Sequence, residues 1–565
     1  MNPLSLVAVV LSVSNHNPGR SSTRVCRRGA WPGLALSLLA GPTLAAVSAG
    51  STGCADVAPT VDMTGAVTAV CSQAGLVNAI QASSTGRVKL PAACSITLTQ
   101  PISIDKNVQI DANGATLSGN NATRIFDVHR NRSTTVNSGY SFTLLNATLR
   151  NGYDSGITDA DGGGGGGAVR GAQFGNLSFY NVQFLNNQSA GLGGEDGGGA
   201  IYKGEGGRLT IFNAHFDGNT ATNGGAVKSL LANVWIVNAS FTNNVARGGN
   251  NGGGAVFIDG LAQTKPKPWS QGGYAPNNYV ADTFAKARVC GAYFAGNSVG
   301  GSYDFNQTGR QGGGLFTHTY SLNGATAIEV ERSVFDGNKS AADGGALRLG
   351  GDGVATGVAA KVFDSLLRNN RAGNHGGAVR LSLNAANFSN LTVADNCANV
   401  DGNVANCVST STGGGIGGGI VSFDRVFNLT GVTLIRNRSA SYGGAMSLSA
   451  AVGQGGTVAS SIFANNTAGN PYGTAQNCSP PAFNGGSASY QYPAPQFNTY
   501  DPGCADPTKI VSTVNPNYGT TPTVCTGRVA GSSYSNAPMS IFVPGAAVLV
   551  NAGTVVPKVG ARCPT

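Results

Sequence analysis

Two clusters of acidic residues are the first candidates for chemistry in this chain of 565 residues. They are Asp154, Asp159 and Asp161, which precede the glycine run 162–167, and Glu195 and Asp196, which precede the glycines at 197–199. Grouped carboxylates supply the oxygen ligands that calcium prefers, and a calcium-dependent lyase would add a base such as Arg170. However, the spacing matches neither an EF-hand loop nor the glycine-rich nonapeptide calcium repeat. We favour solvated loop carboxylates, keep calcium as the alternative, and expect no other cofactor.

Catalysis on a polysaccharide needs two or three carboxylates that converge within about 5–10 Å. Asp217 and Asp336 recur in the chain, but each is followed by glycine inside a repeat, so turn formation explains them. The stretch Asn374-His375-Gly376 is likewise one more repeat turn. The sequence therefore assigns no catalytic residue, and an enzymatic function stays open as an alternative.

The segment between Asp259 and Val289 interrupts the repeats and combines aromatic with cationic side chains. These residues are Lys265, Lys267, Trp269, Tyr274 and Tyr279. Exposed Trp and Tyr stack on sugar rings or anchor a protein partner, and insertions in solenoids often bind ligands. The alternative is a long loop that folds its aromatic rings back onto the repeats. We predict that any ligand contact lies on this insertion.

Ten cysteines follow the N-terminal segment that contains Cys26. An even number in an exported chain indicates disulfides. The shortest loops predict three pairs, which are Cys71 with Cys94, Cys397 with Cys407, and Cys478 with Cys504. No Cys-x-x-Cys pair is present, and the histidines stand far apart, so a zinc site is not expected.

The elements that would position these residues are set by a two-part repeat. The first half is Phe-x-x-Asn, as in 216–219 and 241–244, and the second is Gly-Gly-Ala followed by an apolar residue, as in 224–227. Period-two alternation between the halves, as in 208–213, predicts short strands. Periods of this size indicate stacked units.

Stacking one coil on the next at ~4.8 Å would bury a continuous core and pair each strand with its copies. The glycine pairs suit positions with positive φ or close backbone approach, and the repeat asparagines would form an inward amide ladder. The prediction is an all-β, single-stranded, right-handed parallel β-helix. At ~25 residues per coil, it would contain on the order of 15 coils.

Four regions follow from these signals. Residues 1–49 are predicted to be a signal peptide, because Arg24, Arg27 and Arg28 precede an apolar stretch and a small-residue cleavage site. Residues 50–95 form an N-terminal cap with a short helix near 76–81, residues 96–470 form the β-helix, and residues 471–565 form a disulfide-tied C-terminal cap.

Composition limits the class of function. Glycine contributes 85 residues and charged residues only 11%, as expected for a repeat array. The formal charge of +9 includes four arginines of the signal segment, and the remaining +5 is scattered. We therefore expect no nucleic-acid partner, and no later segment is long enough for a membrane-spanning helix.

The Phe-x-x-Asn and Gly-Gly-Ala-Val halves resemble the repeats of the polymorphic outer-membrane protein family. The run from Val88 to Gly114 resembles the first coils of pectin-lyase-like β-helices, and the tail at 545–553 faintly resembles choice-of-anchor Q proteins. The first resemblance covers roughly residues 70–470 and implies a secreted or surface-displayed adhesin. The chain departs from it by ending in Arg562-Cys563-Pro564-Thr565, without the terminal aromatic residue of an autotransporter barrel.

The sequence thus favours a secreted or cell-surface β-helix that binds a polysaccharide or a cell-surface ligand without catalysis. The alternatives are a polysaccharide lyase or glycoside hydrolase on the same fold, and a purely structural rod. Oligomeric state is left open.

Overall fold

The computed structural model describes most of the repeat region, and all described residues belong to the unit Ala45–Thr565. Described are Cys54, Asp56 and residues 58–469, with gaps at 133–136, 157–163, 249–251, 262–285, 301–309, 320–326, 352–359, 384–385, 400–414, 424–426, 442, 450–457 and 460, and the short segments 478–479, 523–525, 539–541, 550–551 and 554–555. The predicted signal peptide and most of the predicted C-terminal cap lie outside these residues. Among the described residues, no helix is long and apolar enough to cross a membrane.

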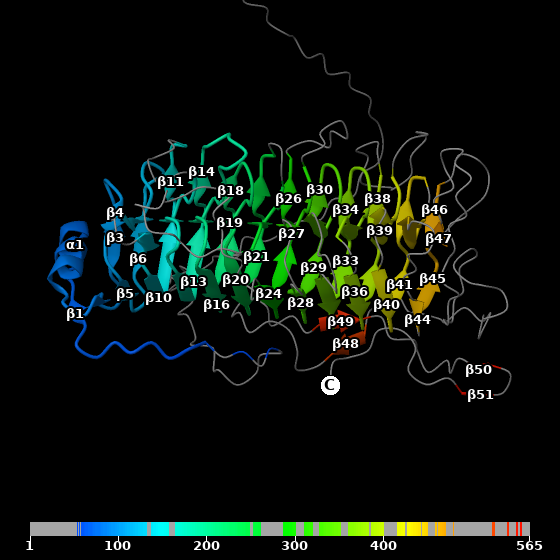
Figure 1. Cartoon of the computed structure of the whole chain (residues 1–565), viewed down its shortest axis with the longest axis horizontal. Coiled ribbons are helices and arrows are strands. Elements are labelled where there is room, and N and C mark those ends of the chain that lie inside the picture. Colours follow the sequence, from blue (N-terminus) through cyan, green and yellow to red (C-terminus); the bar gives the residue numbers. More distant parts are fainter. Residues whose placement is uncertain are drawn as a thin grey trace, which may run out of the picture. The chain divides into compact units, whose positions relative to one another are not determined.

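Three sheets run along the stack of coils, and every pairing between coils is parallel (Figure 1). In the part of the chain that the structure describes, sheet 1 has 23 strands, sheet 2 has 12 and sheet 3 has 10. This arrangement confirms the predicted parallel β-helix. Each complete coil contributes one strand to sheet 2, then one long or two short strands to sheet 1, then a two-residue strand to sheet 3.

The strands have the following bounds. Sheet 1 contains β1 (Val67–Thr68), β2 (Arg87–Lys89), β3 (Ser95–Thr97), β5 (Val108–Asp111), β6 (Thr116–Ser118), β10 (Phe142–Arg150), β13 (Leu177–Leu185), β16 (Arg208–Phe212), β17 (His215–Asp217), β20 (Asn233–Val237), β21 (Ser240–Thr242), β24 (Lys286–Cys290), β25 (Tyr293–Ala295), β28 (Ala327–Glu331), β29 (Val334–Asp336), β32 (Ala360–Phe363), β33 (Leu366–Arg368), β36 (Ala386–Ser389), β37 (Thr392–Ala394), β40 (Phe427–Thr430), β41 (Thr433–Ile435), β44 (Val458–Ala459) and β45 (Ile462–Ala464). Sheet 2 contains β4 (Ile102–Ile104), β7 (Phe126–Val128), β12 (Val169–Gly171), β15 (Ile201–Lys203), β19 (Val227–Leu230), β23 (Val256–Asp259), β27 (Leu315–Thr319), β31 (Leu347–Gly351), β35 (Val379–Leu381), β39 (Ile420–Phe423), β43 (Met446–Ser449) and β47 (Cys478–Ser479). Sheet 3 contains β11 (Tyr153–Asp154), β14 (Gln188–Ser189), β18 (Thr220–Ala221), β22 (Val245–Ala246), β26 (Ser298–Val299), β30 (Lys339–Ser340), β34 (Arg371–Ala372), β38 (Cys397–Ala398), β42 (Arg438–Ser439) and β46 (Thr467–Ala468). Three antiparallel pairs lie outside these sheets: β8 (Arg130–Arg132) with β9 (Asn137–Gly139), β48 (Thr523–Cys525) with β49 (Met539–Ile541), and β50 (Val550–Asn551) with β51 (Thr554–Val555).

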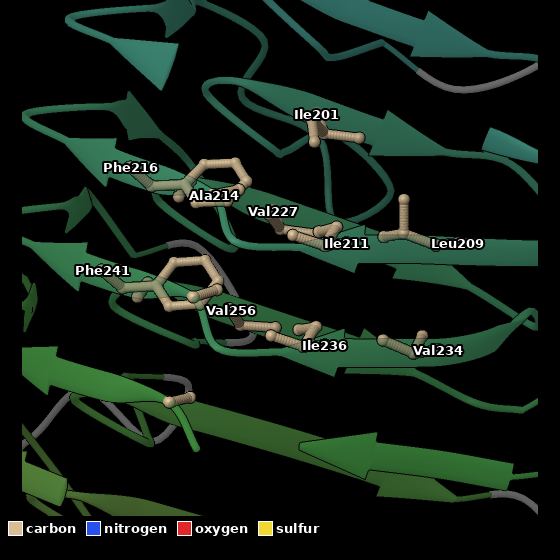
Figure 2. Packing of buried hydrophobic residues seen from close by; sticks show 14 of the residues in the cluster. Ile201, Leu209, Ile211, Ala214, Phe216, Val227, Val234, Ile236, Phe241 and Val256 are labelled. Carbon is tan, nitrogen blue, oxygen red and sulfur yellow. The ribbon is translucent and has the colours of Figure 1, made fainter. Parts of the chain in front are cut away.

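Alternation along the strands of sheet 1 builds the core. Figure 2 shows Leu209, Ile211 and Phe216 of one coil beside Val234, Ile236 and Phe241 of the next, each at the matching position. The five repeat phenylalanines from Phe184 to Phe335 stack face to face with ring centroids 4.6–4.8 Å apart. The inward apolar side chains of each repeat are therefore all used to pack one coil against the next.

The repeat asparagines form the predicted inward ladder. From Asn187 to Asn437, each Nδ2 donates to Oδ1 of the asparagine in the next coil at 2.9–3.0 Å, and all nine ladder residues are at most 1% exposed. The nine residues are Asn187, Asn219, Asn244, Asn297, Asn338, Asn370, Asn396, Asn437 and Asn466. Each Nδ2 of this ladder also donates to a backbone carbonyl, as Asn219 does to Phe184 at 2.9 Å.

The glycine pairs are explained by space and by backbone angle. Gly224 has φ of +54°, and a Cβ on Gly225 would lie 2.2 Å from the carbonyl oxygen of Gly254 in the next coil. Only glycine fits where two backbones approach this closely. The glycines that precede each strand of sheet 2 are thus required by the short distance between the backbones of adjacent coils.

A helix covers the first coil, as predicted. Helix α1 (Gln73–Ala82) begins after Ser72, whose Oγ accepts from the backbone N–H of Gly75 at 3.0 Å. Leu76 and Ile80 are buried in the core cluster of the first coils. The side-chain cap and the i, i+4 spacing of these residues are typical of an amphipathic capping helix.

The described residues contain fewer coils than the predicted number, which was on the order of 15. Sheet 2 holds twelve described strands, because the spacing between coils varies with loop length. Paired residues of sheet 2 are 26 apart from Ile201 to Val227 but 59 apart from Val256 to Leu315. The estimate of ~25 residues per coil was taken from the shortest repeats alone.

Candidate functional site

A pocket of about 200 Å³ lies on the outer face of sheet 1, across the strands β16, β20 and β24 of three successive coils. It is lined by Arg208, Asn233, Val234, Trp235, Lys286 and Arg288. Register brings these residues together, because Arg208 pairs with Asn233, and Trp235 pairs with Arg288. Residues 25 and 53 positions apart in sequence therefore become neighbours.

The alternation that fills the core also turns the pocket side chains outward. Val234 and Ile236 are buried among the core residues, so Asn233 and Trp235 face the other side of β20. Asparagine side chains of one coil fix the first residue of the strand in the next coil. Asn176 Oδ1 accepts from the backbone N–H of Arg208 at 3.0 Å, and Asn233 Oδ1 accepts from the backbone N–H of Lys286 at 2.8 Å.

Arg208 and Trp235 contact each other in the lining of the pocket. The Arg208 guanidinium lies 5.3 Å from the centroid of the Trp235 ring, within the range of a cation–π contact. Arg208 has no ion-pair partner among the described residues, and the indole N–H of Trp235 has no acceptor there. The guanidinium of Arg208 therefore keeps hydrogen-bond donors that no described residue uses, whereas the indole N–H of Trp235 is buried.

The other two cations are balanced by carboxylates that do not line the pocket. Lys286 pairs with Glu329 at 2.9 Å. Arg288 pairs with Glu331 at 2.5 Å and with Asp56 at 2.9 Å. Among the described residues, the lining thus combines one indole and three cations with no carboxylate.

The predicted ligand-binding insertion lies largely outside the described residues. This applies to 262–285, which include Lys265, Lys267, Trp269, Tyr274 and Tyr279. Its two ends are described. The segment leaves after Leu261 and returns at Lys286, the first residue of β24, which lines the pocket. The insertion therefore joins the fold at the pocket.

The described members of the acidic clusters have protein donors. Asp154 binds Arg124 Nη2 at 2.6 Å and Ser189 Oγ at 2.8 Å. Asp196 accepts from the backbone N–H groups of Gly164 and Gly193 at 2.9 and 2.7 Å. Glu195 lies 3.5 Å from the buried Lys228 Nζ. Asp159 and Asp161 are outside the described residues.

One group of three potential metal ligands occurs in the part of the chain that the structure describes. It consists of Cys54, Cys290 and Glu331, whose ligand atoms lie within 4.8 Å of one another. Both sulfur atoms are already joined in a disulfide. A disulfide sulfur is not a thiolate ligand, so this group does not fit a metal.

Two disulfides are fully described. The Cys71–Cys94 bond was predicted and is confirmed, whereas Cys54–Cys290, with a separation of 236 residues, was not. Cys397 is also disulfide-bonded. Cys407, Cys504 and the side chain of Cys478 lie outside the described residues, so the other two predicted pairs stay predictions.

Sequence reasoning missed Arg208, Trp235 and Arg288. The available signal was their position, because each lies at an outward position of a strand whose neighbours are apolar. Such a position usually carries a solvated side chain, so Trp235 was the residue to single out; it is half-buried and packs against the apolar cluster of Tyr180 and Phe212. No protein-family model matches the chain, and no curated protein is significantly similar to it.

Proposed function

We propose that this protein is a non-catalytic, secreted or surface-associated β-helix that binds carbohydrate at the pocket of Trp235 and Arg208. The observation that carries this proposal is an aromatic and cationic pocket at the point where the insertion 262–285 rejoins the fold. The insertion would complete the site with its own Trp, Tyr and Lys residues.

The chemistry of the pocket supports a sugar ligand. An indole offers an apolar surface for the C–H faces of a sugar ring, and flanking guanidinium and ammonium groups donate hydrogen bonds to its oxygens. The scaffold is rigid, since all three strands are hydrogen-bonded to their neighbours in sheet 1. A preformed site loses little conformational entropy when a ligand binds.

The disulfides support a location outside the reducing cytosol. Cys54–Cys290 and Cys71–Cys94 are formed in this chain, and such bonds persist in oxidising compartments. A polysaccharide or glycosylated cell surface is the partner that fits this location.

The test is binding of the full chain to a polysaccharide and cell-surface glycan array. Trp235→Ala and Arg208→Gln should each weaken binding by at least tenfold, which corresponds to about 1.4 kcal/mol. Replacing residues 266–278 with a short Gly-Ser linker should weaken it similarly, since surface loops usually tolerate such changes. The matched control is Lys361→Ala, an exposed cation on the outward row of Trp235 and Arg288, two coils beyond Arg288.

Undiminished binding by both pocket variants would place the site elsewhere. Depolymerisation of any glycan by the intact protein would replace the proposal with the lyase or hydrolase alternative. Absence of binding to every glycan, with binding to a protein on cell surfaces, would contradict the carbohydrate class.

A further inference from the structure

An N-terminal segment lies along the outer face of sheet 1 and is fixed there at several points. This strap comprises Cys54, Asp56 and residues 58–62, and Figure 1 shows it as the blue trace that runs beside the strands of sheet 1. Cys54 is bonded to Cys290 of β24, and Asp56 lies 2.9 Å from Arg288. At the far end, Asp62 pairs with Arg87 at 2.9 Å.

The strap covers an apolar row that the fold would otherwise expose. The row consists of the outward positions Leu145, Tyr180, Phe212, Val237 and Cys290, which are paired in register across five coils. Ala58 and Val61 of the strap belong to the same apolar cluster. Tyr180 and Phe212 are only 8% and 4% exposed, although they point away from the core. An uncovered apolar stripe on a sheet invites association.

The disulfide of the strap is shielded. Cys54 is 4% exposed and Cys290 is 0% exposed. The Glu331 carboxylate lies within 4.8 Å of both sulfur atoms. Reduction would create a thiolate in apolar surroundings beside a carboxylate, and both conditions oppose a thiolate. We therefore expect thiol–disulfide exchange at this bond to be slow once the strap is closed.

We infer that the strap is a single-use latch, open while Cys54 and Cys290 are thiols and locked when they are oxidised after folding of the coils. In the locking step the two thiols lose two protons and two electrons. The electrons pass by thiol–disulfide exchange to a disulfide oxidant, which leaves as two thiols. Because 236 residues separate the cysteines, the bond can form in register only after β24 has joined the stack.

Closure also sets the charge of the pocket. With the strap closed, Arg288 faces Asp56 and Glu331, whereas an open strap leaves only Glu331. Locking the strap therefore adds the Asp56 carboxylate beside Arg288, so the pocket reaches its final charge distribution only when the fold is complete. It does not depend on the proposed carbohydrate ligand, and its tests need none.

The first experiment compares the two described disulfides within one folded molecule. Reductant is added to the native full chain, thiols are alkylated at intervals, and each cysteine is followed by mass spectrometry. Cys71 is exposed, so Cys71–Cys94 should be reduced at least tenfold faster than Cys54–Cys290. Equal rates would overturn the inference, because the latch would then not be locked.

The second experiment opens the latch. Cys54→Ser/Cys290→Ser should keep the β-sheet circular dichroism of the native chain, bind more of an apolar dye, and be cut between residues 54 and 62 at least tenfold faster by a broad-specificity protease. Cys71→Ser/Cys94→Ser is the matched control and should leave cleavage of the strap unchanged. A double variant whose strap stays protected would overturn the inference.

A variant with the disulfide intact decides the matter should the first double variant fail to fold. Val61→Ser weakens the packing of the strap on the apolar row. It should accelerate reduction of Cys54–Cys290 several-fold while leaving reduction of Cys71–Cys94 unchanged. An unchanged rate at Cys54–Cys290 would show that the strap does not shield this bond.

Discussion

At the scale of single residues, the ladder asparagine uses its whole side-chain amide. Asn338 donates to Phe294 O and to Asn370 Oδ1, at 2.9 and 3.0 Å. Its Oδ1 accepts from the backbone N–H and the Nδ2 of Asn297. A buried amide of this kind is costly to remove because its partners have no water to replace it.

We therefore predict that Asn338→Ala destabilises the protein by roughly 1–3 kcal/mol for the groups left unpaired. The measurement is the thermal or denaturant midpoint. The control is Asn369→Gly, because Asn369 has φ of +56° and glycine occupies the same repeat position at 218, 296 and 337. Equal midpoints for Asn338→Ala and the native chain would show that the ladder does not stabilise the stack.

Lys203 is a second residue whose environment has a measurable consequence. It is fully buried, and its Nζ donates to the carbonyl oxygens of Gly204 and Gly206, both at 2.6 Å. Burial lowers the pKa of Lys203 to about 7, against the opposing effect of Glu205. A neutral amine keeps two N–H groups, which is enough for both carbonyls.

The pH dependence follows from that lowered pKa. In the unfolded chain a lysine titrates near pH 10.4, so between about pH 7 and pH 10 the unfolded state binds more protons than the folded state. Stability should therefore rise with pH through this window, with a slope of at most about 1.4 kcal/mol per pH unit. Relative to Lys203→Met, the native chain should gain stability between pH 7 and pH 9.5. Parallel stability curves for the two proteins would contradict a neutral Lys203.

Single residues also show where sequence reasoning was right for an incomplete reason. Asp217 was attributed to turn formation, and its role is indeed within the repeat. Its Oδ1 accepts from Thr242 Oγ1 at 2.6 Å and from Asn243 Nδ2 at 3.0 Å in the next coil. The turn itself is made by Gly218, with φ of +66°. Contacts between coils are invisible to a motif that is read within one coil.

At the scale of elements, the sequence predicted the inward half of the structure well. Short strands with period-two alternation, glycine pairs and repeated Phe-x-x-Asn all act within one coil or between identical positions of adjacent coils. Their meaning is therefore the same in every repeat. Helix α1 was predictable for the same reason, since Leu76 and Ile80 lie one turn apart.

The outward half could not be predicted because it depends on register across loops of unequal length. Trp235 and Arg288 are 53 residues apart in sequence because the insertion precedes β24, and they become neighbours only through the pairing of β20 with β24. The strap depends on a pairing over 236 residues, for which local spacing carries no signal. The pocket and the strap are therefore findings of the structure, whereas the insertion 262–285 was singled out from composition.

At the scale of the whole stack, every coil is stabilised by its two neighbours, so the ends are the weak points. The first coils are covered by α1, whose Leu76, Ala79 and Ile80 are buried against the same core cluster that continues through the coils. Without this helix, the apolar interior and the strand edges of the first coils would face water. Open edges of this kind pair with other chains.

We predict that Leu76→Asp removes this cover and makes the protein associate end to end. Leu76 is 0% exposed, so a carboxylate there would be buried without a partner, and the helix would detach to hydrate it. Light scattering and size-exclusion chromatography should show concentration-dependent assemblies, while circular dichroism retains the β-sheet signal because the remaining coils still support one another. The matched control is Asn78→Asp, which adds the same charge at an exposed position of the same helix and should leave the protein unassociated. A Leu76→Asp variant with the hydrodynamic size of the native chain and an unchanged melting temperature would mean that α1 is an appendage and that the first coils close their own end.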